Sequence, residues 1–207
     1  MQDLSRRNIL KSVALGAGAF GLCGALLKPV AARAAQACVV RPELLTKASA
    51  AFGEHSALIT QRDIIAIADF SAASHDPRFH LFNVHNGDTT TLLVAHGKGS
   101  DPEHSGWLRS FSNIPGSEAS SAGSYRVGES YFGQHGQSLR LAGLDPENDQ
   151  AEARAIVIHP AWYVSDAMIA EHGKLGRSQG CFAVSESDIA QVLERLGSGS
   201  FLFADKV

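Results

Sequence analysis

The chain has 207 residues, with 18 Lys or Arg, 21 Asp or Glu and a formal net charge of −3 at pH 7. Residues 1–34 hold five of the basic residues and one of the acidic ones, so residues 35–207 keep 13 basic and 20 acidic residues, a net charge of −7. This balance argues against a nucleic acid or an anionic membrane surface as a partner, because a negative surface attracts neither. The length allows one domain with a sizeable core and a short appendage.

The N-terminus has the three regions of an export signal. Residues 5–11 are charged and include the pair Arg6 and Arg7, and residues 12–27 form an apolar run without a charge. Residues 32–34 read Ala-Arg-Ala, a small-x-small cleavage site, and residues 35–37 offer a second one. The pattern predicts a twin-arginine-type signal peptide over residues 1–34.

A membrane-spanning helix is the alternative interpretation of the apolar run. Residues 12–27 are short for a span, which needs about 20 residues, and their glycine and alanine content makes them only weakly apolar. We therefore expect export to the periplasm or cell wall of a bacterium, with no stable membrane insertion after cleavage.

The mature chain is predicted to begin with an N-terminal helical segment, residues 35–57. Its helix runs from Arg41 to Gly53, because Pro42 suits a first turn and four apolar residues share one face: Leu44, Leu45, Ala48 and Phe52. Residues 58–59 and then 64–70 are nearly continuous in apolar character, which predicts a strand buried on both faces.

The next segments predict a β-hairpin and a long loop. Residues 78–85 and 88–95 flank Asn86-Gly87, a dipeptide that accepts positive φ angles, so we expect a hairpin with a two-residue turn. Residues 96–122 are irregular and rich in Ser, Gly and Asn, and Trp107 lies among them. Loops of this length usually carry function, so this loop is a candidate to face a substrate.

The rest of the chain reads as short strands and two helices. Strands are expected at residues 123–131, 138–141, 154–158 and 200–204, and a short helix within 162–172. A second helix is predicted after Ser185, which with Asp188 forms a capping-box pattern, and Gly197 ends it. The pattern therefore predicts a single, mainly β (α+β) domain over residues 58–207.

Cys181 and His159 form the candidate catalytic pair. Cys181 ends the glycine-containing loop of residues 176–181, and His159 ends a short apolar strand. A thiol attacks a carbonyl as the thiolate, and a nearby imidazole is the usual means of making one at neutral pH. Two alternatives stay open: Cys181 as a small buried hydrophobic residue, or a structural disulfide between Cys38 and Cys181 in an oxidising compartment.

Three blocks of sequence resemble one known family. The blocks are residues 121–127, which resemble its Thr-Pro-x-Gly-x-Tyr-x-Ile strand, Ile158-His159-Pro160, which resemble its Ile-His-Gly, and Ser178-Gln179-Gly180-Cys181, which resemble its Ser-His-Gly-Cys. The family is the murein L,D-transpeptidases, with a YkuD-type cysteine domain. Residues 69–71, 94–98, 138–144 and 176–181 look like its divergent branch.

The resemblance implies a β-sandwich-type catalytic domain that acts on peptidoglycan stem peptides. Cys181 would be the nucleophile and His159 the base, and a backbone carbonyl near Ser178 or a side chain would orient the imidazole. The amides of Gly180 and Cys181 would hold the oxyanion. The thioester would pass to an amine in a 3→3 cross-link. A murein hydrolase or L,D-carboxypeptidase would use water instead, and a wall-binding domain with the disulfide is the non-catalytic alternative.

The chain departs from the family pattern around Cys181. Gln179 replaces a second histidine, Phe182 stands where the family has isoleucine or valine followed by a substrate-holding arginine, and Arg177 is our candidate for the missing charge. The predicted substrate-binding set is Arg177, Gln179, His96, His135 and Tyr125. Carbapenems are candidate inhibitors, and the chemistry requires neither metal nor organic cofactor; a zinc site from His75, His80 and His85 is disfavoured because the last two point to opposite strand faces.

Overall fold

The computed structural model describes residues 40–207. The predicted signal peptide, its cleavage sites and Cys38 lie outside these residues and stay predictions. Within residues 40–207, no helix combines the length and apolar character needed to span a bilayer.

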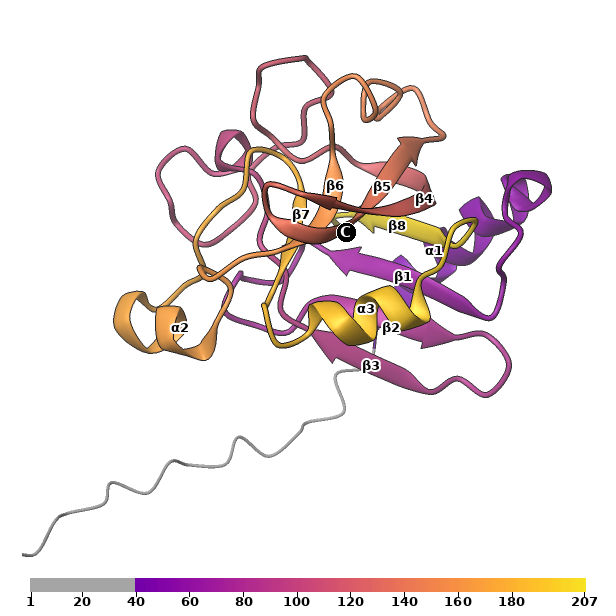
Figure 1. The fold of residues 1–207 in the computed structure, drawn as a ribbon, viewed down its shortest axis with the longest axis horizontal. Helices are drawn as coiled ribbons and strands as arrows, with labels where there is room; N and C mark the ends of the chain where they lie inside the picture. Colours follow the sequence, from indigo (N-terminus) through magenta and orange to yellow (C-terminus); the bar gives the residue numbers. More distant parts are fainter. Residues whose placement is uncertain (1–39) are drawn as a thin grey trace, which may run out of the picture. The chain divides into compact units, whose positions relative to one another are not determined.

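The described residues fold into one mixed eight-stranded sheet with three short α-helices (Figure 1). The strands are β1 (Ile64–Asp69), β2 (Phe79–Asn83), β3 (Thr89–Leu92), β4 (Gly123–Gly133), β5 (Gly136–Gly143), β6 (Val157–Pro160), β7 (Phe182–Val184) and β8 (Phe201–Asp205), and the helices are α1 (Pro42–Glu54), α2 (Asp166–His172) and α3 (Ile189–Arg195). Their order in the sheet is β3-β2-β1-β8-β4-β5-β6-β7, with β1 parallel to β8 and β6 parallel to β7. The predicted mainly β (α+β) fold class is confirmed.

The sheet curls so that its two ends approach each other. Ala95, just after β3, forms an isolated antiparallel bridge with Ala183 of β7, although these strands occupy opposite edges of the sheet order. Phe70, just after β1, stacks on Phe182 of β7 with ring centroids 6.0 Å apart. The halves of the sheet therefore enclose a common core, as a sandwich does.

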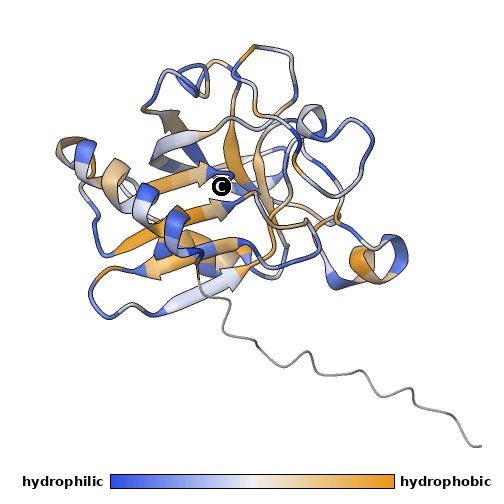
Figure 2. Ribbon diagram, turned by 180° about the vertical axis from the view of Figure 1, so that it is seen from behind, coloured by the Kyte–Doolittle hydropathy of each residue, from blue (hydrophilic) through white to orange (hydrophobic). Residues whose placement is uncertain are grey.

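Strand β1 is buried on both faces, as its continuous apolar character predicts. Ala66 and Ala68 face the main core, which also takes Val192 of α3, whereas Ile65 and Ile67 pack in a second cluster with α1. The two helices thus cover opposite faces of β1 (Figure 1). Figure 2 shows apolar residues gathered in the strands and polar residues in the surrounding loops.

The β2–β3 hairpin does not have the predicted two-residue turn. Asn83 N–H donates to Asp88 O at 2.8 Å and Gly87 N–H donates to Asn83 O at 2.9 Å, which closes a four-residue loop. Asn83 Oδ1 also accepts from His85 N–H at 2.9 Å, and of the two predicted turn residues only Gly87 has a positive φ, 77°. The side chain of Asn83 therefore favours a wider turn than the dipeptide signal indicates.

Other element boundaries also differ from the predictions. Leu58, where strand character was predicted to begin, ends a 3₁₀ turn over residues 56–58, and β1 starts at Ile64. Strand β6 starts at Val157 rather than at Arg154. Helix α3 starts only at Ile189, because Ser185 Oγ accepts from Asp188 N–H at 3.0 Å and donates to Asp188 Oδ2 at 2.7 Å, which makes a separate turn before the helix. The helix predicted within 162–172 is present as α2, and Ser165 caps it.

Candidate active site

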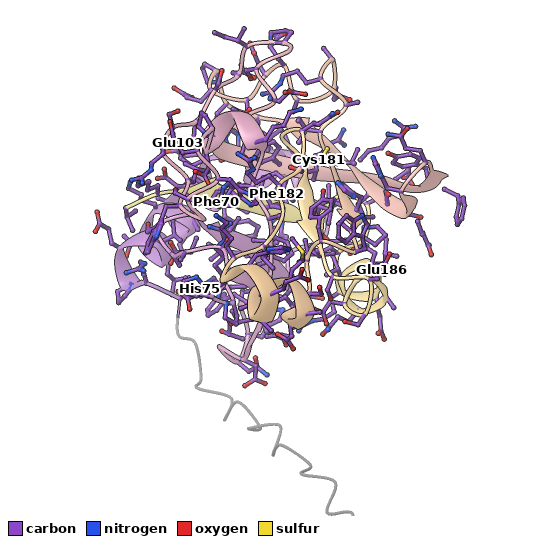
Figure 3. All side chains as sticks on the ribbon, turned by 90° about the vertical axis from the view of Figure 1, so that its left-hand side faces the viewer. Phe70, His75, Glu103, Cys181, Phe182 and Glu186 are labelled. Atoms are coloured by element: carbon purple, nitrogen blue, oxygen red, sulfur yellow. The ribbon has the colours of Figure 1, made fainter. Side chains whose placement is uncertain are left out.

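The parallel pair β6–β7 sets the relative positions of Cys181 and His159. Ile158 pairs with Phe182, and both are buried in the main core. Because side chains alternate along a strand, His159 points to the opposite side of the sheet from Ile158. Cys181 stands immediately before β7 and packs in part against the main core, yet it lines the same cleft as His159 (Figure 3 labels Cys181 beside Phe182 and Phe70).

Both side chains line a cleft of about 970 Å³. It brings together six of the predicted site residues: Cys181, His159, Ser178, Arg177, Gln179 and His135. It also contains residues that the sequence analysis did not select, among them Glu118, Tyr131, Arg154, Ala155 and Tyr163. Loop 96–122 contributes Pro115 and Gly116 to the lining, whereas Trp107 lies outside it.

The imidazole of His159 is held in one tautomer. Nδ1 lies 2.9 Å from the carbonyl oxygen of Pro160, which can only accept, so Nδ1 carries the proton and Nε2 is the acceptor in the neutral ring. The ring of His135 stacks on it with centroids 4.4 Å apart. Burial lowers the pKa of His159, the bond to Pro160 raises it, and the charge of His135 lowers it further, with a net lowering. The ring is therefore a neutral base at pH 7.

Cys181 carries a free, half-buried thiol. Burial raises its pKa, while the N–H of Val157 and the charge of Arg154 lower it, and burial dominates. Its Sγ lies 3.7 Å from the carbonyl oxygen of Ala155, a residue with the unusual φ of 53°. The two directions favour a protonated thiol and a neutral imidazole at rest. The alternative disulfide involves Cys38, which the structure does not describe.

Ser178 organises the loop that presents the thiol. Its Oγ donates to the carbonyl of Cys181 at 2.7 Å and accepts from Gly180 N–H at 3.1 Å. Its backbone bonds to His96 O at 2.9 Å and to Lys98 N–H at 2.8 Å. The carbonyl that orients His159 is therefore that of Pro160 and not one near Ser178, which corrects the prediction.

Gly180 has a conformational role in this loop. Its φ is 114°, and an added Cβ would lie 2.7 Å from Ala119 O and 2.9 Å from Ile156 Cδ1. Its amide already donates to Ser178 Oγ, so it does not fit the predicted role of oxyanion donor. Glycine is required here because other residues resist this φ and have no space for a side chain.

A family model described as L,D-transpeptidase catalytic domain matches residues 36–204. The chain belongs to the L,D-transpeptidase catalytic domain family. The resemblance noted in the sequence is confirmed.

Solved structures to which this chain is similar include L,D-transpeptidases. That from Mycobacterium smegmatis is 12% identical, with a TM-score of 0.43, over 69% of this chain and 58% of its own. One from Mycobacterium tuberculosis H37Rv is 15% identical, with a TM-score of 0.43, over 69% of this chain and 57% of its own. The helical cell shape determining protein Pgp2 (K307A mutant) from Campylobacter jejuni is 13% identical, with a TM-score of 0.45; the match covers 72% of this chain and 48% of Pgp2. This chain thus matches less than two thirds of each of these chains, and a search of curated proteins gave no match.

Two residues predicted to bind substrate are buried in this L,D-transpeptidase domain. His96 is 1% exposed, with Nδ1 2.8 Å from Arg78 Nη2 and Nε2 3.4 Å from Asp101 Oδ2. Tyr125 is fully buried, its hydroxyl donates to Ser121 O at 2.9 Å, and its ring packs edge-on against Phe182. Neither lines the cleft, so both predictions are corrected: these side chains support the core and the loop rather than face a ligand.

The disfavoured zinc alternative has no support in the geometry. His80 Nδ1 lies 3.0 Å from Thr91 Oγ1, whereas His85 Nε2 lies 2.8 Å from Asp63 Oδ1. In the part of the chain that the structure describes, no group of His, Cys, Asp or Glu residues could hold a metal ion.

Proposed function

We propose that this chain is a peptidoglycan L,D-transpeptidase that uses the Cys181 thiol as its nucleophile. The observation that carries the proposal is that Cys181, just before β7, and His159, on the neighbouring strand β6, line one cleft. The bond from His159 Nδ1 to Pro160 O leaves Nε2 as the proton acceptor. Membership of the L,D-transpeptidase family supplies the substrate class, and the N-terminal sequence supports export to the periplasm or cell wall.

The proposed reaction has two halves. His159 Nε2 takes the thiol proton as the sulfur attacks the carbonyl at the L-centre of a diaminopimelate residue in a stem peptide. The oxyanion forms beside the amide of Cys181, the C–N bond breaks, and the leaving D-alanine amine takes the proton from His159. An amine of a second stem then attacks the thioester, forms the cross-link and restores the thiol. Because the intermediate is a thioester, carbapenem acylation of Cys181 is expected by the same chemistry.

Product analysis tests the reaction type. The mature domain and its Cys181→Ala variant are incubated with purified disaccharide-tetrapeptide, and the products are identified by mass spectrometry. We expect a cross-linked dimer with the native protein and none with the variant. Free D-alanine with tripeptide alone would make the protein an L,D-carboxypeptidase, and no product with a reduced thiol, on this or a cross-linked muropeptide, would contradict the catalytic assignment.

A further inference from the structure

Arg154 lies against the loop of residues 176–181, which presents the Cys181 thiol, at a position that none of the family-like blocks includes. It lines the cleft, three residues before Val157, the β6 residue that neighbours Cys181. A Cβ added to Gly180 would lie 3.1 Å from Arg154 Nη2, so the guanidinium contacts the residue that precedes the thiol. Cys181 and Arg154 also interact electrostatically, each favouring the charged form of the other.

Neutral groups hold the Arg154 guanidinium in place. Nη1 donates to Ser112 O at 2.8 Å and to Ser121 Oγ at 2.6 Å, and Nη2 donates to Ala119 O. A guanidinium has five N–H groups, so two remain for a further acceptor. Within residues 40–207 no carboxylate forms an ion pair with it. The cation is therefore fixed in geometry and not neutralised by a partner charge.

The other charges of the cleft leave it positive. Arg177 Nη1 also donates only to backbone oxygens, those of Asp101 and Pro102. The acidic residue of the lining, Glu118, pairs with Lys98 at 2.8 Å. A positive cleft in an otherwise acidic domain concentrates anionic ligands, and a preorganised guanidinium binds carboxylates with good geometry.

We propose that Arg154 binds a carboxylate of the acyl donor, that of the residue released when the thioester forms. The inference rests on the proposed function, because that function defines the donor: the released residue of a stem peptide carries its free carboxylate close to the scissile amide. Arg154 thereby selects donors that end in a free acid over donors that end in an amide.

A pair of alkylating reagents tests the anion site without any peptidoglycan substrate. In both iodoacetate and iodoacetamide, the Cys181 sulfur displaces iodide from the methylene carbon to form a thioether, and only the first carries a carboxylate. Because both react with the same thiolate, the ratio of their rate constants cancels the thiolate fraction. We expect this ratio to be higher for Cys181 than for free N-acetylcysteine. A ratio equal to or below that of N-acetylcysteine would overturn the proposal.

Variants assign the effect to Arg154. In Arg154→Gln one positive charge near the thiol is lost, and we expect the ratio of the iodoacetate to the iodoacetamide rate constant to fall on the order of tenfold. Arg154→Lys keeps the charge, and we expect its ratio to stay within about threefold of the native value. Arg62→Gln is the matched control, since Arg62 also bonds backbone carbonyls, those of Ile59 and Ser56, outside the cleft. Equal ratios in all three variants, or equal losses in the Gln and Lys variants of Arg154, would contradict the assignment.

A peptide pair then connects the anion site with turnover. The tetrapeptide and its C-terminal amide are compared as donors, and we expect the amide to raise KM about tenfold in the native protein and little in Arg154→Gln. If the tetrapeptide with a free carboxylate is turned over, and amidation still raises KM about tenfold in Arg154→Gln, the inference about Arg154 fails while the proposed function stands. If neither peptide is turned over although the reagent ratio is high, the proposed function fails while the anion site stands.

Discussion

Replacement of His159 by asparagine is expected to lower kcat/KM for D-alanine release by about 10²–10⁴-fold, the usual contribution of a general base. The asparagine amide can still donate to Pro160 O, as Nδ1 now does at 2.9 Å, so the strand end keeps its hydrogen bond. What is lost is the Nε2 acceptor. Release of D-alanine from the tetrapeptide measures the change, and thermal unfolding of the variant is the control for an intact fold.

The pH dependence of thiol alkylation distinguishes two roles for His159: a general base that acts during the reaction, and a partner that keeps Cys181 as a thiolate before substrate binds. Burial raises the pKa of Cys181 and lowers that of His159, so little thiolate is present at neutral pH and its fraction increases as pH rises. We expect the iodoacetamide rate to climb from pH 6 to pH 10 in both the native protein and His159→Asn. An iodoacetamide rate that is constant at acid pH in the native protein, but not in His159→Asn, would contradict the protonated resting thiol. A kcat/KM for D-alanine release within tenfold of the native value in His159→Asn would contradict the role of His159 as general base.

Arg78→Met is expected to reduce the free energy of unfolding by about 3–5 kcal/mol, a large part of the 5–15 kcal/mol typical of a domain. Arg78 is fully buried and donates to Val94 O, Ala72 O and His96 Nδ1, and its guanidinium lies 5.0 Å from the centre of the Phe70 ring. Methionine fills similar space but leaves these acceptors without a donor, each at a cost of about 1–3 kcal/mol. Denaturant unfolding measures the difference.

The matched control is Arg62→Met. Arg62 likewise donates to carbonyls, those of Ile59 and Ser56, but it is exposed, so water replaces the lost bonds. We expect a change of about 0.5 kcal/mol or less there. A similar loss of unfolding free energy in both variants would show that the buried hydrogen bonds of Arg78 stabilise the fold no more than the exposed ones of Arg62. Because Ser178 N–H bonds to the carbonyl of His96, Arg78→Met should also weaken the hold on the loop of residues 176–181.

Segments whose apolar pattern is local were predictable from sequence. The run around Ile65 and Ile67 identified a strand buried on both faces, and the spacing of Leu44 and Ala48 identified the face of α1 that packs on it. Strand β7 was missed, because its three residues, Phe182–Val184, are strand only through pairing with β6, more than 20 residues earlier. Such pairing leaves no local period to detect.

The site residues likewise fall into those that local sequence identifies and those whose place depends on the fold. Cys181 is identified by its residue type at the end of a glycine-containing loop, and His159 by its residue type at the end of an apolar strand. The structure places both in one cleft. His96 precedes a glycine as a cleft residue would, yet burial against Arg78 and Asp101 removes it from the surface, which the sequence could not show. Arg154 was assigned to a strand because apolar residues follow it, although it lies in the turn before β6.

The most direct test of the central claim is detection of the thioester itself. The mature domain is mixed with disaccharide-tetrapeptide, quenched in acid within the first turnovers, and analysed by mass spectrometry of the intact protein and of its peptides. We expect a mass increase equal to the disaccharide-tetrapeptide minus D-alanine, located on the peptide that contains Cys181, sensitive to hydroxylamine and absent from Cys181→Ala. Product formation without any adduct at Cys181, or unchanged activity in Cys181→Ala, would contradict it.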